Sequence, residues 1–383
     1  MNKRVEVKVD ERLKDFRNFL YLVWKHLNLP EPTEIQYDIA NYLQDNGLDD
    51  KIKRKIIEAF RGVGKSYITA AFVCWRLLLN NDEKILVVSQ NKERAIQFTV
   101  QTRKLIEEMS ILQHLKPRKD QRDSALGFDI NGCNNSQSPS VRAAGITGQI
   151  TGSRASIIIA DDVETPGNSA TQVQREKLSG LVKEFDSILI PGGEIIYLGT
   201  PQTIESLYNK LKRRGYKCRI WTGRYPKDDK ALQSYGEEIA PFIKNRLLND
   251  TNLYGKCVDL ARFSEEDMRE RELSLGKSTF QLQFMLDTTL SDAEKYPLKQ
   301  EDFIVMNVDK DKAPVKVVWS NNKENRIEEL PNSGFTGDRW HKPLFISDEW
   351  SDYTGSVMTI DPSGRGKDET AYRDWETDRK SVV

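Results

Sequence analysis

The sequence predicts an α/β protein in which helices cover both faces of a mainly parallel sheet. Three observations lead to this fold class: strand-like and helix-like segments alternate through the first half of the chain, a glycine-rich loop follows the first strand, and carboxylates follow a later one. The strands are expected at 55–60, 84–89, 156–160 and 194–198, and the helices at 11–28, 34–43, 65–79, 92–109 and 170–185.

The composition is that of a globular protein. The 383 residues suffice for two domains, and 38% hydrophobic with 30% charged residues suits a soluble protein better than a disordered or membrane one. The longest apolar runs are too short to cross a bilayer, and the N-terminus lacks the apolar core of a signal peptide, so neither membrane insertion nor secretion is expected. Cys74, Cys133, Cys218 and Cys257 are far apart, so reduced thiols are expected rather than a zinc site or disulfides.

The charge balance gives no global basic field for nucleic acid. Lys plus Arg and Asp plus Glu both number 58. Local basic runs occur at 51–55, 116–119 and 210–217, and the ordinary interpretation of each is a solvated helix face or loop. A motor that grips and releases DNA repeatedly can use a modest basic surface, whereas a static binder usually needs more. Composition therefore permits DNA as a partner without requiring it.

The glycine-rich loop after the first strand has the chemistry of a phosphate site. Gly62 and Gly64 leave room for backbone N–H groups to point at phosphate oxygens, and the next helix presents its N-terminus to the same charge. Lys65 can reach the β- and γ-phosphates, and Ser66 can ligate magnesium. Ala59 stands where the usual Gly-x-x-x-x-Gly-Lys-Ser pattern has its first glycine, so the alternative is a plain glycine-rich turn.

An apolar strand that ends in carboxylates supplies the second part of an ATP hydrolysis site. Asp161 is expected to hold the magnesium shell, and a neighbouring carboxylate, Asp162 or Glu164, to polarise the attacking water. On a strand, 161 and 162 point to opposite sides whereas 162 and 164 share one, which leaves the base open between the last two. The alternative for Glu164 is a loop carboxylate that caps a helix.

Two further polar segments complete the predicted site. Thr200 and Gln202 follow a strand expected to lie beside the acidic one, where they can sense the γ-phosphate; the alternative is a plain strand-to-turn junction. Upstream, Gln36 lies in a segment suited to reading adenine, because an amide offers the base edge both a donor and an acceptor. Glutamine is also common on ordinary helix faces.

The pattern changes after about Thr203. A helix start with a capping box is expected at 264–267, a strand at 315–320, a loop at 332–340 and a new strand at 357–361. The expected organisation is an ATPase core with an N-terminal helical segment, a lid or linker subdomain, the start of a further domain and a non-native tail, at 1–203, 204–350, 351–372 and 373–383.

Taken together, these motifs resemble the large terminase subunit of tailed bacteriophages, most closely the T7-like branch, over residues 30–372. The motifs that carry the resemblance are 32–36 (Pro-Thr-Glu-Ile-Gln), 60–66 (Phe-Arg-Gly-Val-Gly-Lys-Ser), 144–154 (Ala-Gly-Ile-Thr-Gly-Gln-Ile-Thr-Gly-Ser-Arg), 161–164, 198–202, 280–287 and 357–370. The resemblance implies a P-loop ATPase of the additional-strand class that uses ATP and Mg²⁺ to drive double-stranded viral DNA into a procapsid.

The resemblance also implies partners and arginine roles. A homo-oligomeric ring on the portal protein, working with the small terminase subunit in the cytoplasm of the infected bacterium, is expected. Arg61 matches a family arginine that contacts the γ-phosphate. Arg142 and Arg154 are candidates for an arginine supplied to a neighbouring subunit, and a structural salt bridge is the alternative for either.

The family further implies an RNase H-like nuclease domain that uses two divalent metals. Asp361 matches its first metal ligand and Asp368 a nearby acidic position. The polar segment 373–383 lacks strand alternation and is expected to be foreign to the protein, so the nuclease domain is expected to be truncated and unable to cut DNA by itself.

Two other functions fit parts of the sequence. A helicase of related fold also carries a glutamine segment and a phosphate loop, although 204–350 shows no evident second nucleotide lobe. A non-catalytic nucleotide-binding assembly module would bind ATP without turnover. Strand separation on a forked duplex favours the first alternative, and binding without hydrolysis favours the second.

Overall fold

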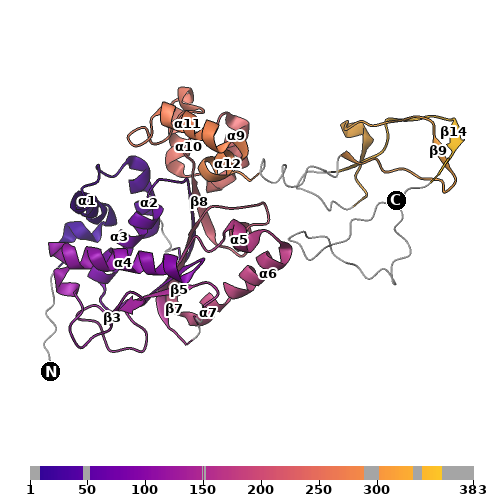
Figure 1. Ribbon diagram of the computed structural model, residues 1–383. Coiled ribbons are helices and arrows are strands. Elements are labelled where there is room, and N and C mark those ends of the chain that lie inside the picture. Colours follow the sequence, from indigo (N-terminus) through magenta and orange to yellow (C-terminus); the bar gives the residue numbers. More distant parts are fainter. Residues whose placement is uncertain are drawn as a thin grey trace. The chain divides into compact units, whose positions relative to one another are not determined.

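The computed structural model describes the chain in six segments, 9–45, 52–148, 150, 152–288, 302–330 and 339–355. The chain divides into two compact units, Met1–Ser291 and Asp292–Val383. The first unit is built on one large sheet with helices on both faces, and the described part of the second consists of short paired strands (Figure 1).

The sheet of the first unit has eight strands in the order β3-β4-β5-β2-β6-β7-β1-β8. Their bounds are β1 Arg54–Ala59, β2 Ile85–Ser89, β3 Asp123–Ser124, β4 Gly127–Phe128, β5 Val141–Gly145, β6 Ala155–Asp161, β7 Leu189–Gly199 and β8 Lys217–Trp221. The six strands from β5 to β8 pair in parallel, whereas β3 and β4 add an antiparallel edge. The predicted α/β class with a mainly parallel sheet is confirmed.

The strand order places β7 between β1, which leads into the glycine-rich loop, and the acidic strand β6. β7 is therefore the additional strand that the resemblance implied. β2 and β6 are rich in Ile and Val, and these two strands and β1 bury nearly every residue, as expected for parallel strands covered on both faces. β5 and β8 were not predicted.

Helices cover each face of the sheet. One face packs against α1 Phe16–His26, α2 Glu34–Gln44, α3 Lys65–Leu79 and α4 Lys92–Glu108, and the other against α6 Gln172–Leu181, α7 Glu184–Ile188 and α8 Leu207–Arg213, with the short α5 at Pro166–Ser169 (Figure 1). Alternate strand residues divide between the two cores, so Val87 joins the first and Val88 the second. Helices on both faces are thus confirmed.

The residues after Thr203 continue the first unit. Their helices are α9 Asp229–Ser234, α10 Pro241–Asn249, α11 Glu265–Leu275 and α12 Lys277–Phe280, followed by a π-helical turn at Gln281–Met285. Trp221 on β8 and Phe263, Met268 and Phe284 beyond it belong to the same core as α1–α4. The expected division at 203/204 therefore lies inside a compact unit, because residues on both sides of it form one sheet.

Several local expectations can be compared with this structure. The expected helix over 11–28 is a short 3-10 turn followed by α1, and the expected helix over 170–185 is divided into α6 and α7. The capping box at 264–267 is confirmed: the Ser264 hydroxyl accepts from the Asp267 N–H, and the Asp267 carboxylate accepts from the Ser264 N–H. α2 begins with a similar box, formed by Thr33 and Gln36.

The described part of the second unit contains antiparallel strand pairs and a 3-10 turn at Lys323–Asn325. Its strands are β9 Lys312–Pro314, β10 Val317–Val318, β11 Arg326–Ile327, β12 Trp340–His341, β13 Phe345–Ile346 and β14 Trp350–Asp352. β10 pairs with β13, β11 with β12, and β14 with β9. The strand expected over 315–320 covers only two residues, and the strand expected at 357–361 lies outside the described residues.

The four cysteines all lie in described segments and are free thiols, with Cys74 and Cys257 buried and Cys133 and Cys218 half-buried. In the part of the chain that the structure describes, no helix is both long and apolar enough to span a bilayer.

Candidate active site

The glycine-rich loop connects β1 to α3 with two residues in the left-handed region. Gly62 and Gly64 have φ angles of 97° and 92°, which residues with a side chain rarely adopt. Gly64 is the N-cap of the 15-residue helix α3, whose first N–H groups have no partner within the helix. The loop and helix end together favour an anion at this position.

Lys65 and Ser66 connect this loop to the acidic strand. The Lys65 ammonium donates a hydrogen bond to the Ala59 carbonyl. Burial lowers the pKa of Lys65, and the carboxylates of Asp162 and Asp161 oppose that shift. The Ser66 hydroxyl lies close enough to the Asp161 carboxylate to oppose the rise in its pKa. Two motifs almost a hundred residues apart in the sequence therefore meet at the carboxyl ends of the parallel strands.

The two adjacent carboxylates differ in environment. Burial, and secondarily the charge of Asp162, raise the pKa of Asp161 to about 7, against the opposing effects of Lys65, Arg94 and Ser66. Asp162 is exposed, has a φ of 46°, and donates its N–H to the Leu198 carbonyl at 2.9 Å. A divalent cation beside Asp161 would favour its ionised form.

The donor set beside the loop fits Mg²⁺. The Ser66 hydroxyl and the Asp161 carboxylate are adjacent hard oxygen donors, the type that Mg²⁺ prefers. Among the described residues, no group of three or more His, Cys, Asp or Glu side chains is arranged to hold a metal. Asp361 and Asp368, the expected nuclease ligands, lie outside the described residues.

β7 lies beside the acidic strand, as its sequence predicted. The register pairs Asp161 with Leu198, so β7 ends one residue later at Gly199. A side chain on Gly199 would overlap the buried Tyr208 hydroxyl of α8, which explains why this strand ends in glycine. Thr200 and Gln202 follow directly, and the Gln202 amide donates to the Thr200 carbonyl at 2.9 Å.

Glu164 is fully engaged within the protein. Its buried carboxylate accepts the Gln202 N–H, the Ser206 hydroxyl and the Leu207 N–H, the last two at the start of α8. Burial raises the pKa of Glu164, although these hydrogen bonds oppose the shift. This is the helix-capping arrangement that the sequence left open as the alternative.

Gln36 lies behind the glycine-rich loop. Its side chain is only 1% exposed; its carbonyl oxygen accepts the Thr33 N–H at 3.0 Å, and its amide donates to the Val63 carbonyl at 2.8 Å. Gln36 thus connects the start of α2 to the loop. Its predicted contact with adenine stays a prediction.

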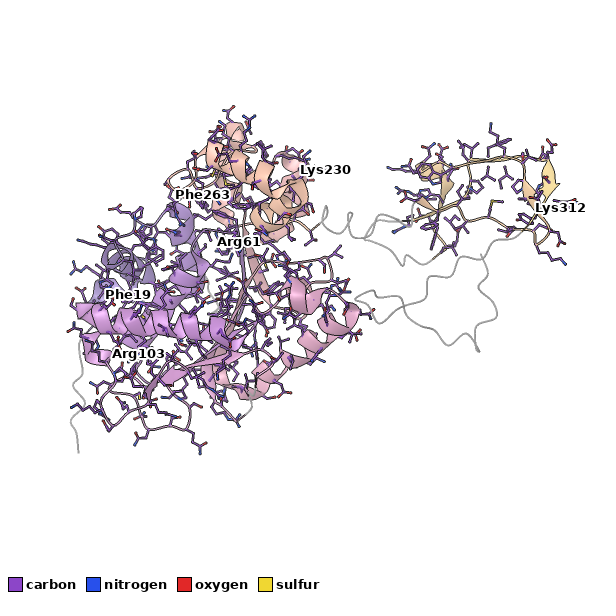
Figure 2. All side chains as sticks on the ribbon, viewed as in Figure 1. Phe19, Arg61, Arg103, Lys230, Phe263 and Lys312 are labelled. Atoms are coloured by element: carbon purple, nitrogen blue, oxygen red, sulfur yellow. The ribbon has the colours of Figure 1, made fainter. Side chains whose placement is uncertain are left out.

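Arg61 lies in the loop but bonds toward the second half of the first unit. Its N–H donates to the Gln283 carbonyl at 3.0 Å, and its guanidinium to the Gln283 side-chain oxygen at 3.4 Å. Arg61 is exposed, and Figure 2 labels it together with Phe263, whose ring packs against Gly62.

Arg142 and Arg154 are not brought to this edge of the sheet. Arg154 immediately precedes β6 and donates to the Ser187 carbonyl, whereas Asp161 ends the same strand. Seven strand residues at about 3.3 Å each separate the two by roughly 20 Å. Arg142 is level with Ile158 across β2 and hydrogen-bonds to Ser153. Both arginines therefore lie away from the end of β6 that carries Asp161.

Sequence reasoning missed two features of the site. The first is Arg94, in the first turn of α4, whose positive charge opposes the rise in the pKa of Asp161. Its position just after β2, a strand parallel to β6, was the signal that could have identified it. Arg262 donates to the Val63 carbonyl at 2.9 Å, and Phe263 covers Gly62. Nothing in the local sequence indicates a contact across almost two hundred residues.

Known proteins provide an independent comparison. The chain is 50% identical over 363 residues to the large terminase subunit of Enterobacteria phage T3, which corresponds to 94% of this chain and 61% of that protein. Residues 56–187 match the family described as the N-terminal part of the T4likevirus-type terminase large subunit. The predicted resemblance to large terminase subunits is confirmed. Relative to the large terminase subunit of phage T3, this chain spans about three fifths of the length.

Two solved structures of large terminases are also similar. The HK97 bacteriophage large terminase matches with a TM-score of 0.46 and 15% identity, over 79% of this chain and 61% of that one. The ATPase domain of the Thermus phage P74-26 large terminase matches with a TM-score of 0.38 and 13% identity, over 69% of this chain and 96% of that one.

Proposed function

We propose that this chain is the ATP-hydrolysing motor subunit of a phage DNA-packaging terminase, which moves double-stranded viral DNA into a procapsid. The observation that carries the proposal is the meeting of the loop and the acidic strand: Lys65 and Ser66 lie against Asp161 at the end of the sheet where α3 begins. The identity to the phage T3 subunit supports the same assignment.

In this proposal the loop holds the ATP phosphates. The backbone around Gly62 and Gly64 and the N-terminus of α3 face the β- and γ-phosphates, and Lys65 exchanges its bond to the Ala59 carbonyl for phosphate oxygens. Ser66 and Asp161 hold Mg²⁺, which neutralises charge on the phosphates when bound.

We assign the water-orienting base to Asp162. Asp162 is exposed at the end of β6 beside Lys65 and Asp161, where its carboxylate can accept a proton from water. Glu164 has its carboxylate buried and shared among three donors, so it is better suited to hold α8. Thr200 and Gln202 are the proposed γ-phosphate sensors, because Gln202 also bonds to Glu164 and so connects the end of β7 to α8.

The arginines divide by position. Arg61 is proposed to contact the γ-phosphate of its own subunit, since it lies inside the loop. Arg154 or Arg142 is proposed to serve a neighbouring subunit in a ring on the portal protein, because both are distant from their own Asp161. The small terminase subunit is proposed as a further partner, and the cytoplasm of the infected bacterium as the place where the motor works.

Steady-state ATP hydrolysis by the purified chain tests the motor function. Wild type and Lys65→Ala are compared with and without procapsids and linear duplex DNA. Turnover that Lys65→Ala abolishes, and that procapsids and DNA stimulate, supports the proposal. ATP binding without turnover in every mixture would favour an assembly module, and strand separation on a forked duplex would favour a helicase.

A matched pair of isosteric variants tests the base. Asp162→Asn is expected to lower kcat by at least a hundredfold while nucleotide still binds. Glu164→Gln keeps an acceptor for α8 and is expected to lower kcat far less. The reverse order would assign the base to Glu164. The expected loss of nuclease activity needs its own test, because Asp361 and Asp368 lie outside the described residues. Cleavage of plasmid DNA by the purified chain with Mg²⁺ or Mn²⁺ measures it.

A further inference from the structure

We propose that Arg262 is a positioning residue of the phosphate loop: it fixes the peptide between Val63 and Gly64 so that the loop N–H groups face the phosphates. This inference rests on the proposed nucleotide binding. It extends that proposal to a residue 199 positions away from the loop.

The Val63 carbonyl accepts two hydrogen bonds from separate parts of the chain. Gln36 on α2 donates its side-chain amide at 2.8 Å, and Arg262, just before α11, donates its guanidinium at 2.9 Å. The Val63 side chain is itself fully buried. The oxygen is thus held from two directions, once by a neutral donor and once by a charged one, and the charged bond is the stronger type.

The geometry of the peptide bond turns this contact into a constraint on the site. In a planar trans peptide the C=O and the following N–H point in opposite directions. Fixing the Val63 oxygen therefore also fixes the Gly64 N–H, which points to the other side. The constraint matters because this peptide ends at Gly64, whose φ is 92°, and glycine opposes a peptide flip less than any other residue.

Arg262 is held in place by its own segment. The Arg262 and Phe263 N–H groups both donate to the Asp259 carbonyl, at 3.1 and 2.9 Å. The Asp259 carboxylate accepts the Thr33 hydroxyl at 3.2 Å, which connects the segment to the start of α2. The Arg262 guanidinium lies 5.6 Å from the centre of the Phe263 ring, and that ring packs on Gly62. The segment 259–263 therefore lies across the loop.

Arg271 provides a matched control. It lies over the same Phe263 ring at 5.3 Å, but it belongs to α11. Among the hydrogen bonds of the described residues, the side-chain donors to the Val63 carbonyl are Gln36 and Arg262. Removal of Arg271 therefore takes away a similar charge and ring contact and leaves the loop carbonyl with both donors.

The experiment measures binding of a fluorescent ADP analogue with Mg²⁺ to the full chain, together with the unfolding temperature without nucleotide. Wild type is compared with Arg262→Ala, Arg262→Lys and Arg271→Ala. Arg262→Ala is expected to weaken binding about tenfold, the loss typical of one charged hydrogen bond. Arg262→Lys, which keeps a charged donor, is expected to recover part of that loss, and Arg271→Ala to stay within twofold of wild type.

The outcomes separate this inference from the proposal beneath it. If wild type binds the analogue and Arg262→Ala binds it as well as Arg271→Ala does, Arg262 does not position the loop. If the affinity of Arg262→Ala falls only in step with its unfolding temperature, and lysine restores neither, the role is merely structural and the inference is wrong. If wild type itself does not bind the analogue, the nucleotide proposal fails and this inference fails with it.

Discussion

The two units differ in how far their described strands bury apolar side chains. In the first unit β1, β2 and β6 bury their residues between helical layers, and Trp221 on β8 is 0% exposed. In the second unit the described strands leave large apolar side chains in solvent, with Phe345 51% and Trp350 40% exposed. Apolar strands thus occur in both units, but among the described residues the buried apolar clusters belong to the first.

The difference comes from the number of layers. An eight-stranded sheet with a helical layer on each face removes its side chains from water on both sides, whereas a two-stranded ladder covers little surface by itself. An apolar residue is therefore expected to contribute more to the free energy of unfolding in the first unit than in the second. Matched substitutions, one in each unit, test that conclusion directly.

The largest difference is expected for tryptophan. Trp221→Ala removes a fully buried ring whose indole N–H donates to Asp38 at 2.8 Å, and it should lower the free energy of unfolding by about 3–5 kcal/mol. Trp350→Ala should change it by about 0.5 kcal/mol or less. Urea unfolding of the full chain, followed by circular dichroism, measures both. Equal losses would contradict the comparison.

The next difference is expected at two glycines. Gly199→Ala places a methyl group against the hydroxyl and ring of Tyr208, which is fully buried, and should cost about 1–3 kcal/mol of unfolding free energy. At Gly355 in the second unit, no atom of the described residues lies within 4 Å of the same position, so Gly355→Ala should be close to neutral. Thermal unfolding of the two variants, side by side, gives the answer; an unaffected Gly199→Ala would mean that α8 repacks freely.

A smaller effect is expected from a partly buried charge. Burial raises the pKa of Asp38, against the hydrogen bond from Trp221 and the charge of Arg219. Between the unfolded pKa of about 3.9 and the raised folded pKa, the folded protein therefore binds more protons than the unfolded chain. Over that range this group makes the fold less stable as pH rises. Asp38→Asn keeps the acceptor for Trp221 and removes that loss.

The unfolding temperature of Asp38→Asn relative to wild type should accordingly increase from pH 4 to pH 7. Asp352→Asn, on the exposed strand β14, shows how much the removal of a surface carboxylate contributes. A difference that shrinks with rising pH would reverse the assigned direction.

The smallest effect on stability is expected at an exposed aromatic ring of the second unit. Phe345→Ser on β13 should leave the unfolding free energy within about 0.5 kcal/mol, because the ring is half in solvent, while it lowers self-association through an apolar surface. Light scattering at increasing protein concentration measures the second effect. Phe185→Ser, at a fully buried ring, is the control that should destabilise the first unit instead.

Much of the first unit could be predicted because its signals are local. The apolar runs of β2 and β6, the glycines at 62 and 64, and the carboxylates after β6 each identify themselves within a few residues. That β6 and β7 lie side by side could be predicted from the polar residues at the end of each strand. α3 was predicted with its observed bounds, since the glycine before it and Asn80 after it delimit an apolar helix.

The rest depends on contacts distant in sequence. β8 carries Lys217 and Arg219 and buries only its last two residues fully, so it lacks a clear strand pattern, and its pairing with β1 defines it. Glu164 shows its role only through its bonds to Gln202 and α8. Arg262 reaches Val63 across 199 residues, which no short motif encodes.

The environments of the four cysteines determine where a fluorescent dye would attach to this protein. Thiol dyes attach to the thiolate, and burial raises the pKa of Cys74, Cys218 and Cys257 above the ordinary thiol value. Cys133 is half-buried on the loop before β5, where its sulfur contacts the Gln121 amide at 3.6 Å. A maleimide fluorophore is therefore expected to mark Cys133 first, which gives the native sequence its own handle for single-molecule observation.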